Sequence, residues 1–214
     1  MFPMSTAATP KGLRRRARLV EAAAELLMAG GVDAVRHRAV ADRAELPLAS
    51  TTYYFGSLDD LLAAAVSHVS SADAAAISVR CDALSRRRRG AAATADALAE
   101  VFVGSDTTRA QLATRYELVV LAARYTGLQD SIRERQGLLS VLHVDALVKS
   151  GRTGDVAHAA QLLAVEDGAV VGALAQGDLD AASAARDALV EVVDVLAPLS
   201  AEADFSAPLH WSGA

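Results

Sequence analysis

The chain has 214 residues, which fits one or two small domains, and 52% of its residues are hydrophobic although only 4% are aromatic. A core of Ala, Leu and Val favours helices over strands, so we expect an all-α protein. The net charge of −5 argues against a protein that coats nucleic acid non-specifically. The single Cys81 excludes an intramolecular disulfide, and no Cys/His spacing suits a metal site, so we expect neither metal nor cofactor.

The N-terminal segment, residues 1 to about 12, is small, polar and Pro-containing, which predicts a mobile arm. Arg14 and Arg15 open the helix that follows. Gly30 and Gly31 predict the end of this helix, since glycine favours helix C-termini. Apolar residues recur along it at i, i+3, i+4, i+7 and i+8: Leu19, Ala22, Ala23, Leu26 and Leu27.

Two short helical patterns lie between Val35 and Leu62, separated by Glu45-Leu46-Pro47. Proline is tolerated at the first turn of a helix, so Pro47 can end one helix and open the next. Two helices joined by so short a turn predict a helix-turn-helix. The second of them, Leu48 to Phe55, is a recognition-helix candidate because Ala49, Ser50 and Thr52 are small enough to approach base edges.

Residues of these two helices divide into a core set and a DNA-binding set. For Arg38 we favour a contact to a phosphate or to a guanine edge. For Arg36 two roles stay open, the same DNA contact or a place on a solvated face. We count Arg14 and Arg15 with them. The core set faces the first helix: Val40, Ala44, Leu46, Thr51 and Phe55.

The order of these features resembles the TetR/AcrR repressors over residues 14 to 66: an amphipathic helix, Gly-Val-Asp-Ala, Arg38-Ala-Val-Ala, the turn, Tyr53-Tyr54-Phe55, Ser57 and Leu61-Leu62. The resemblance implies that Tyr54 binds a phosphate beside Tyr53. Because aromatic residues at a helix end commonly pack, one of the two is expected to be structural. Glu45, Thr52 and Leu58 depart from the pattern, since the family usually has Gly, Tyr and Lys there.

A long helix is expected from Leu58 to about Arg80, because Ser57 and Asp60 resemble a capping box. Glycine-containing breaks then predict helices near 91–104, 107–126, 128–149, 155–176 and 180–197. The Arg86–Arg89 run is either a phosphate-binding patch or a solvated loop, and the loop is favoured. We therefore divide the chain into a DNA-binding domain (1–56), an effector-binding and dimerisation domain (57–198) and a flexible tail (199–214).

Charge is uneven between the first of these domains and the rest. Residues 1–56 hold 8 Lys/Arg against 5 Asp/Glu, whereas residues 57–214 hold 13 against 21. A basic N-terminal segment on an otherwise acidic chain supports the prediction that residues 1–56 face the phosphates of a nucleic acid.

The last two expected helices carry small and medium apolar residues: Val156, Ala160, Leu163, Val170 and Leu174 on one, and Ala185, Leu189, Val192 and Leu196 on the other. They could pack inside one subunit. The resemblance implies that they form a four-helix homodimer interface, which we prefer because helix-turn-helix proteins generally bind two half-sites.

Three polar residues interrupt apolar helix faces of the body: Tyr116, His143 and Asp167. A buried polar group needs a partner, so each marks an internal hydrogen bond or a polar group that a ligand meets. With the effector pocket that the resemblance implies, they are our ligand-binding candidates. Arg115 and Arg124 lie off the apolar stripe of the Tyr116 helix and are expected to face solvent.

No phosphate loop, nucleophile elbow or distinctive carboxylate pair is present, so we do not expect an enzyme. The sequence instead favours a cytoplasmic, dimeric repressor that a small, largely apolar effector releases from a palindromic DNA operator. No segment offers about 18 uninterrupted apolar residues, so no membrane span is expected. Two alternatives remain: a DNA-binding regulator without a small-molecule ligand, and a helical interaction protein with a degenerate DNA head.

Overall fold

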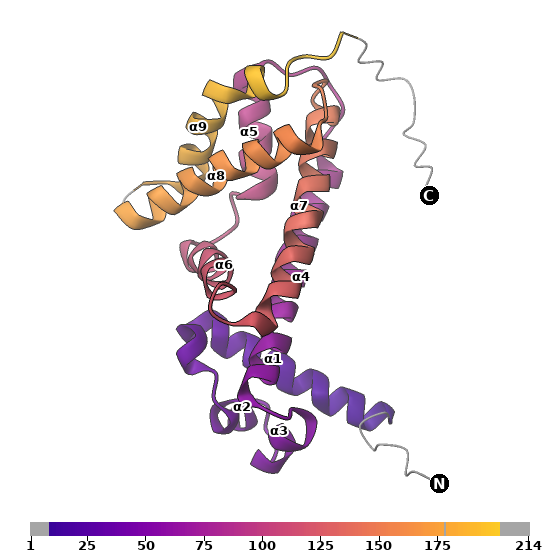
Figure 1. The fold of residues 1–214 in the computed structure, drawn as a ribbon, viewed down its shortest axis with the longest axis vertical. Coiled ribbons are helices and arrows are strands. Elements are labelled where there is room, and N and C mark those ends of the chain that lie inside the picture. The colour runs from indigo at the N-terminus through magenta and orange to yellow at the C-terminus, as the bar shows by residue number, and fades with distance from the viewer. Residues whose placement is uncertain (1–8, 178, 202–214) are drawn as a thin grey trace. The chain divides into compact units, whose positions relative to one another are not determined.

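The computed structural model describes residues 9–177 and 179–201, and the regular structure in this part of the chain is helical. This confirms the all-α expectation. The described residues form nine α-helices and a short 3-10 helix, η2 (Figure 1): α1 (Pro10–Ala34), α2 (His37–Arg43), α3 (Leu48–Tyr54), α4 (Leu58–Ala83), α5 (Ala91–Phe102), α6 (Arg109–Leu121), η2 (Thr126–Leu128), α7 (Gln129–Lys149), α8 (Val156–Gln176) and α9 (Ala181–Leu196).

Side-chain caps fix where several of these helices begin. The Thr9 hydroxyl accepts a hydrogen bond from the Gly12 amide at 3.1 Å, and the Ser57 hydroxyl accepts one from the Asp60 amide at 3.0 Å. Asp155 and Asp180 cap α8 and α9 in the same way. Each cap satisfies an amide that would otherwise lack a partner in the first turn.

The start of α1 corrects one expectation, because residues 10–12 are helical and do not belong to an arm. Proline suits the first helical position, and Thr9 supplies the cap. Residues 1–8 lie outside the described part of the chain.

The predicted end of the first helix is real, although one more helical turn follows it. Gly30 and Gly31 leave helical geometry, and Gly31 has a φ of 67°. A Cβ at Gly31 would lie 3.4 Å from a carboxylate oxygen of Glu117. Glycine is favoured here because it adopts positive φ without a steric penalty.

The chain forms two compact units, which we describe separately. One unit holds the chain up to Ala74 together with Ala110–Gln136; the other holds Ala75–Arg109 and the chain from Gly137 onward. The division of the sequence into functional domains at residues 56/57 and 198/199 stays a prediction.

The first unit has a core to which α1, α2, α4, α6 and the start of α7 contribute. Its fully buried members include Leu19, Leu27, Val40, Leu61 and Leu118. The stripe predicted for α1 faces this core, with Leu26 partly buried beside the others. Burying such side chains stabilises the unit by about 1.5–3 kcal/mol each.

The second unit has a core of its own. Here α8 and α9 pack side by side, and α5 packs against α9. Its buried members include Ile77, Leu98, Leu147, Leu162 and Leu189. After α9, Leu199 forms an isolated antiparallel bridge with Arg152. The predicted tail otherwise lies mostly at residues 202–214, outside the described part.

By length and composition alone, α4 could cross a membrane. Its Leu61, Leu62, Ala65 and Val66 are buried in the core of the first unit. The core helix of a globular protein meets the same length and hydropathy criteria, so we do not read α4 as a membrane span.

Candidate DNA-binding surface and buried polar sites

The turn between α2 and α3 is held by backbone hydrogen bonds. The Leu46 amide donates to Ala41 O at 3.0 Å, and the Ser50 amide donates to Pro47 O at 2.8 Å. Pro47 occupies the N-cap position of α3, as predicted for a residue that separates two helices. Glu45 takes a φ of 52°, which is unfavourable for a residue with a Cβ.

Recognition helix α3 buries one face and exposes the other. Thr51 is fully buried, and its hydroxyl donates to Leu48 O at 2.8 Å. Phe55 is buried directly after the helix, where the guanidinium of Arg16 lies 5.1 Å from its ring centroid. The core set predicted from the sequence is confirmed, with Leu46 only partly buried.

The opposite face of α3 carries small or polar side chains. Ala49 and Thr52 are exposed, and Ser50 is half-buried. Thr52 donates its hydroxyl proton to Ala49 O at 3.3 Å. This surface leaves room for a second molecule to approach the helix closely.

Tyr53 and Tyr54 differ in burial. Tyr53 is 55% exposed, whereas Tyr54 packs partly buried against the core of the first unit. Their rings meet edge to face, with centroids 4.9 Å apart. Tyr54 therefore has the packing role that we expected for one of the two tyrosines, and its partial exposure is compatible with a phosphate contact as well.

The arginines predicted to contact DNA are all exposed, but their surroundings differ. Arg36 donates to Val35 O at 2.9 Å and pairs with Asp33 at 3.1 Å, so it is tied to the loop before α2. Arg14 donates to Pro10 O at 3.3 Å. Arg15 and Arg38 extend from α1 and α2 into solvent.

Comparison with known proteins agrees with this geometry. Residues 19–65 match the family described as "Bacterial regulatory proteins, tetR family", and residues 89–195 match "Tetracyclin repressor-like, C-terminal domain". The chain belongs to the TetR family. It is a transcription regulator with a helix-turn-helix DNA-binding domain and a C-terminal helical domain.

Solved structures of TetR-like proteins resemble the chain over most of its length. The multidrug binding protein EbrR complexed with ethidium is 30% identical, with a TM-score of 0.63, 83% of this chain covered and 97% of that one. In complex with proflavin, EbrR shows 28% identity, a TM-score of 0.66 and coverages of 83% and 99%. SCO1917, a TetR-family member from Streptomyces coelicolor A3, is 29% identical, with a TM-score of 0.61 and coverages of 83% and 97%. No curated protein sequence matches significantly.

In this TetR-family chain, His143 is fully buried in the second unit and has three defined contacts. Its Nδ1 lies 3.0 Å from Leu139 O, and its Nε2 lies 3.1 Å from Oε2 of Glu166. Its ring stacks on Phe102 with centroids 3.5 Å apart. Glu166 is only 1% exposed.

Glu166 was missed as a site residue because α8 was assigned the wrong inward face. Asp167, the predicted candidate, is half-buried, whereas Glu166 is buried beside Leu162 and Val170, four residues to either side. The spacing of Glu166 at i, i+4 from the apolar residues Leu162 and Val170 was the sequence signal that could have placed it on the buried face of α8. The two ligand candidates of the second unit are thus His143 and Asp167, and Glu166 joins them as a buried carboxyl.

Tyr116 belongs to the first unit, where it is half-buried on α6. The sequence predicts an apolar stripe of Leu112, Val119, Val120 and Ala123 beside Tyr116. This stripe is wrong in part: Leu112 is buried, but Val120 is 65% exposed and Ala123 is exposed. The other buried residues of α6 are Thr114, Arg115 and Leu118. Arg124 is exposed as expected. Arg115 is not, because its charge is paired inside the unit.

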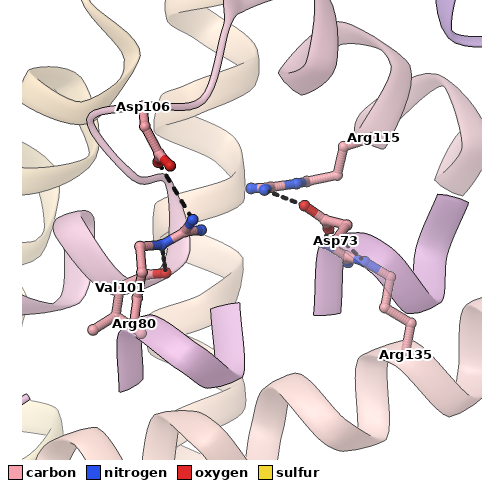
Figure 2. A network of polar contacts seen from close by, with 6 residues as sticks. All are labelled: Asp73, Arg80, Val101, Asp106, Arg115 and Arg135. Atoms are coloured by element: carbon pink, nitrogen blue, oxygen red, sulfur yellow. Dashed lines mark hydrogen bonds and ion pairs between the residues drawn. The ribbon is translucent and has the colours of Figure 1, made fainter. Parts of the chain in front are cut away.

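The partner of Arg115 is Asp73, on α4 (Figure 2). Arg115 Nη2 donates to Asp73 Oδ1 at 2.5 Å, and Arg135 Nη2 donates to Asp73 Oδ2 at 2.5 Å. Burial by itself would raise the pKa of Asp73, but the charges and hydrogen bonds of both arginines hold that pKa below its ordinary value of 3.8. The cluster joins three helices of the first unit.

Within the second unit, Arg80 of α4 fastens the end of α5 (Figure 2). It donates to Val101 O at 2.9 Å and pairs with Asp106 at 3.5 Å. Gly104, in the loop that follows α5, has a φ of 80°, and a Cβ there would lie 2.8 Å from the Arg80 guanidinium carbon.

The arginine run after α4 has an internal member as well as exposed ones. Arg86, Arg87 and Arg88 are exposed, as expected of a solvated loop, but Arg89 is buried and donates to Lys149 O at 3.2 Å. Burial and the neighbouring Arg87 charge lower the pKa of Arg89. This run therefore fastens the loop to the end of α7.

Cys81 is buried, and its Sγ lies 3.5 Å from Asp145. Burial, followed by the Asp145 charge, raises the pKa of this thiol to about 12, so it is unreactive at neutral pH. Within residues 9–177 and 179–201, no group of three His, Cys, Asp or Glu side chains could hold a metal ion.

Proposed function

We propose that this protein is a cytoplasmic transcriptional repressor that binds a palindromic operator as a homodimer and leaves it when a small, largely apolar effector binds. The observation that carries the DNA-binding part is the two-sided character of α3. Thr51 and the adjacent Phe55 anchor it to the core, while Ala49 and Thr52 lie exposed on its other side. Such a helix can enter a major groove.

Charged and polar groups around α3 support the same role. Arg38 extends into solvent from α2, Arg14 and Arg15 are exposed on α1, and part of Tyr54 is accessible. Exposed guanidinium groups bind phosphates or the O6 and N7 atoms of guanine. The same region gives residues 1–56 their positive charge on a chain that is negative as a whole.

The proposed dimer uses the outward faces of α8 and α9. Four residues that the sequence analysis assigned to the dimer interface are buried inside the second unit and are not accessible to a partner: Leu163, Val170, Ala185 and Leu189. The outward face of α8 is instead a stripe of mostly small residues: Ala157, Ala160, Ala164, Gly168, Val171 and Gly172. Small side chains allow two helices to approach closely, and two-fold dimers suit palindromic operators.

The effector part rests on the buried polar groups and on the family. Structures of EbrR are complexes with proflavin, ethidium and imidazole, so a relative of this chain binds small molecules. Tyr116, His143 and Asp167 remain candidate ligand contacts, and Glu166 joins them. Effector binding would alter α4 and so the spacing of two recognition helices about 34 Å apart, with a coupling of about 1–3 kcal/mol.

The proposal can be tested by selecting bound sequences from a pool of random double-stranded DNA with the full-length protein. The expected result is enrichment of a palindrome, with a shifted band on gels for that sequence and not for a scrambled one. Failure to enrich any sequence would favour a helical interaction protein with a degenerate head. Enrichment without release by any small molecule would favour a regulator that has no ligand.

A further inference from the structure

The exposed side of recognition helix α3 presents mainly apolar groups to its surroundings. Four of its residues are exposed: Leu48 (51%), Ala49, Thr52 and Tyr53 (55%). At about 100° per residue, these positions lie within about 140° of one another around the helix axis. Thr51, which is fully buried, points away from them. The four side chains therefore form one continuous surface, which we call the α3 face.

Hydrogen-bonding groups on the α3 face are few. The helix has the sequence LASTTYY, so none of its side chains is charged and none is an amide. Thr52 has one hydroxyl proton, which it donates to Ala49 O at 3.3 Å. While this bond holds, Thr52 offers a base its γ-methyl group and an acceptor oxygen, but no donor. The side chains of Leu48 and Ala49 offer only carbon atoms.

This composition excludes most ways of reading a base edge from α3. Guanine is read by Arg or Lys, adenine by Asn or Gln, and cytosine by Asp or Glu, and α3 has none of these residues. Ser50 is half-buried, and its hydroxyl can meet a donor or an acceptor, so it discriminates little. For α3, the base feature that remains is the 5-methyl group of thymine, which lies in the major groove and makes apolar contacts.

We propose that the α3 face reads the operator through the methyl groups of thymine, and that Leu48 and Thr52 determine this specificity. The inference rests on the DNA-binding part of the proposed function and names the kind of sequence that is bound. Leu48 was not expected among the DNA contacts, but about half of its apolar side chain is exposed. Contact with a thymine methyl group removes apolar surface of both partners from water, which favours thymine over the other bases.

Affinity for DNA does not have to come from the α3 face. Contacts between guanidinium groups and phosphates supply much of the affinity of a DNA-binding protein and carry no sequence information. Arg14 and Arg15 of α1 and Arg38 of α2 are exposed. The α3 face can therefore select a sequence with weak apolar contacts, because these contacts only have to distinguish one base from another.

The first measurement uses the full-length protein and the palindrome selected from random double-stranded DNA. Each thymine is replaced in turn by uracil, in both half-sites, which removes the methyl group and keeps the base pair. Fluorescence anisotropy at a fixed salt concentration gives the dissociation constant. At one or two positions of the half-site we expect the affinity to fall about fourfold for each methyl group removed, the effect of one buried methylene-sized group.

Protein variants identify the side chains responsible. At the position that Leu48 contacts, Leu48→Ala should lose most of the preference for thymine over uracil. The control Leu138→Ala shortens a leucine of α7 that is 42% exposed, and it should bind both operators as the wild type does.

Thr52 allows a matched pair of substitutions. Thr52→Ser removes the γ-methyl group and keeps the hydroxyl, whereas Thr52→Val keeps a methyl group in its place and removes the hydroxyl. We expect Thr52→Ser to bind the selected operator about fourfold more weakly and Thr52→Val to bind it normally. A loss with Thr52→Val and not with Thr52→Ser would overturn the role of Thr52, because the hydroxyl would then read the base.

Equal affinity for thymine and uracil at every position of the selected half-site would overturn the inference, as would a half-site without thymine. A preference for thymine of the same size in the wild type, Leu48→Ala and Thr52→Ser would also overturn it, because the methyl group would then act through DNA shape. In each of these cases DNA binding itself stands. If no sequence is selected at all, the DNA-binding function fails, and the inference fails with it.

Discussion

Asp73 and Arg115 join α4 to α6 through a contact of 2.5 Å between carboxylate and guanidinium, and the Arg115 side chain is only 7% exposed. Arg135 of α7 binds the other oxygen of the same carboxylate. One acidic side chain thus organises two buried arginines from different helices. Removing it would leave both charges in the interior without this partner.

We therefore expect Asp73→Asn to lower the free energy of unfolding by about 3–5 kcal/mol, the range typical of breaking a buried ion pair from one side. Urea denaturation followed by circular dichroism would measure the change. Asp106→Asn is the matched control, since Asp106 is 79% exposed and its pair with Arg80 should contribute at most about 1 kcal/mol. Equal losses in the two variants would contradict a special role for Asp73.

The Asp73 cluster also predicts how stability depends on pH. The folded-state pKa of Asp73 is lowered from 3.8, so its contribution is fully present above that value and is lost as the pH falls through the lower, folded-state pKa. The difference in Tm between the wild type and Asp73→Asn should therefore shrink below about pH 4. A difference that stays constant down to about pH 2.5 would show that the carboxylate charge is not responsible.

Arg38→Ala should weaken operator binding by about 1–3 kcal/mol, because the exposed guanidinium is available for DNA. Tyr54→Phe should cost about 0.5–1.5 kcal/mol, since it removes only a hydroxyl and keeps the packed ring. Fluorescence anisotropy with the selected operator would measure both. Arg43→Ala, which removes an arginine paired with Glu25 at 3.0 Å, is the control expected to have the smaller effect. Normal binding by Arg38→Ala would show that the wrong face of α2 was assigned to DNA.

Glu45 stands at a positive φ of 52°, where the family usually has glycine. Glu45→Gly and Glu45→Ala both remove the carboxylate and its exposed contact with Arg18, so they differ only in the cost of this backbone conformation. We expect the glycine variant to be the more stable by about 1 kcal/mol. Thermal denaturation would measure the difference. A more stable alanine variant would imply that the turn relaxes to a negative φ.

Gly172→Leu tests the proposed dimer. No atom lies within 4 Å of a Cβ built at Gly172, so a larger side chain fits the isolated subunit. We expect the variant to fold normally but to dissociate to monomers at micromolar concentration, because the side chain would separate two closely packed helices. Light scattering measures the mass, and Gly127→Leu, also open but on η2, is the control. A monomeric wild type would contradict both the dimer and the palindromic operator.

Helix positions were predictable from the sequence because local signals fix them. The Ser57 cap places the start of α4 at Leu58, Pro47 separates α2 from α3, and Gly31 ends the main part of α1. The same is true of the inward face of α1, where Leu19, Ala22, Ala23 and Leu27 of the predicted stripe are buried. Caps, breakers and amphipathic periodicity act within a few residues, so no tertiary contact is needed to recognise them.

Tertiary structure decided which faces of α6 and α8 point inward. Helix α8 carries Ala, Gly and Val on nearly every side, so periodicity could not distinguish Glu166 from Asp167 or an interior stripe from an outward one. On α6, the buried Arg115 looked like a surface residue until Asp73, 42 positions earlier, was found beside it. Burying a charge is costly unless an opposite charge or several hydrogen-bond acceptors meet it, and the acidic partner of Arg115 lies on another helix, α4. The sequence by itself therefore determined the helices and the DNA-binding head, and only the folded chain determined the pairing of the buried charges.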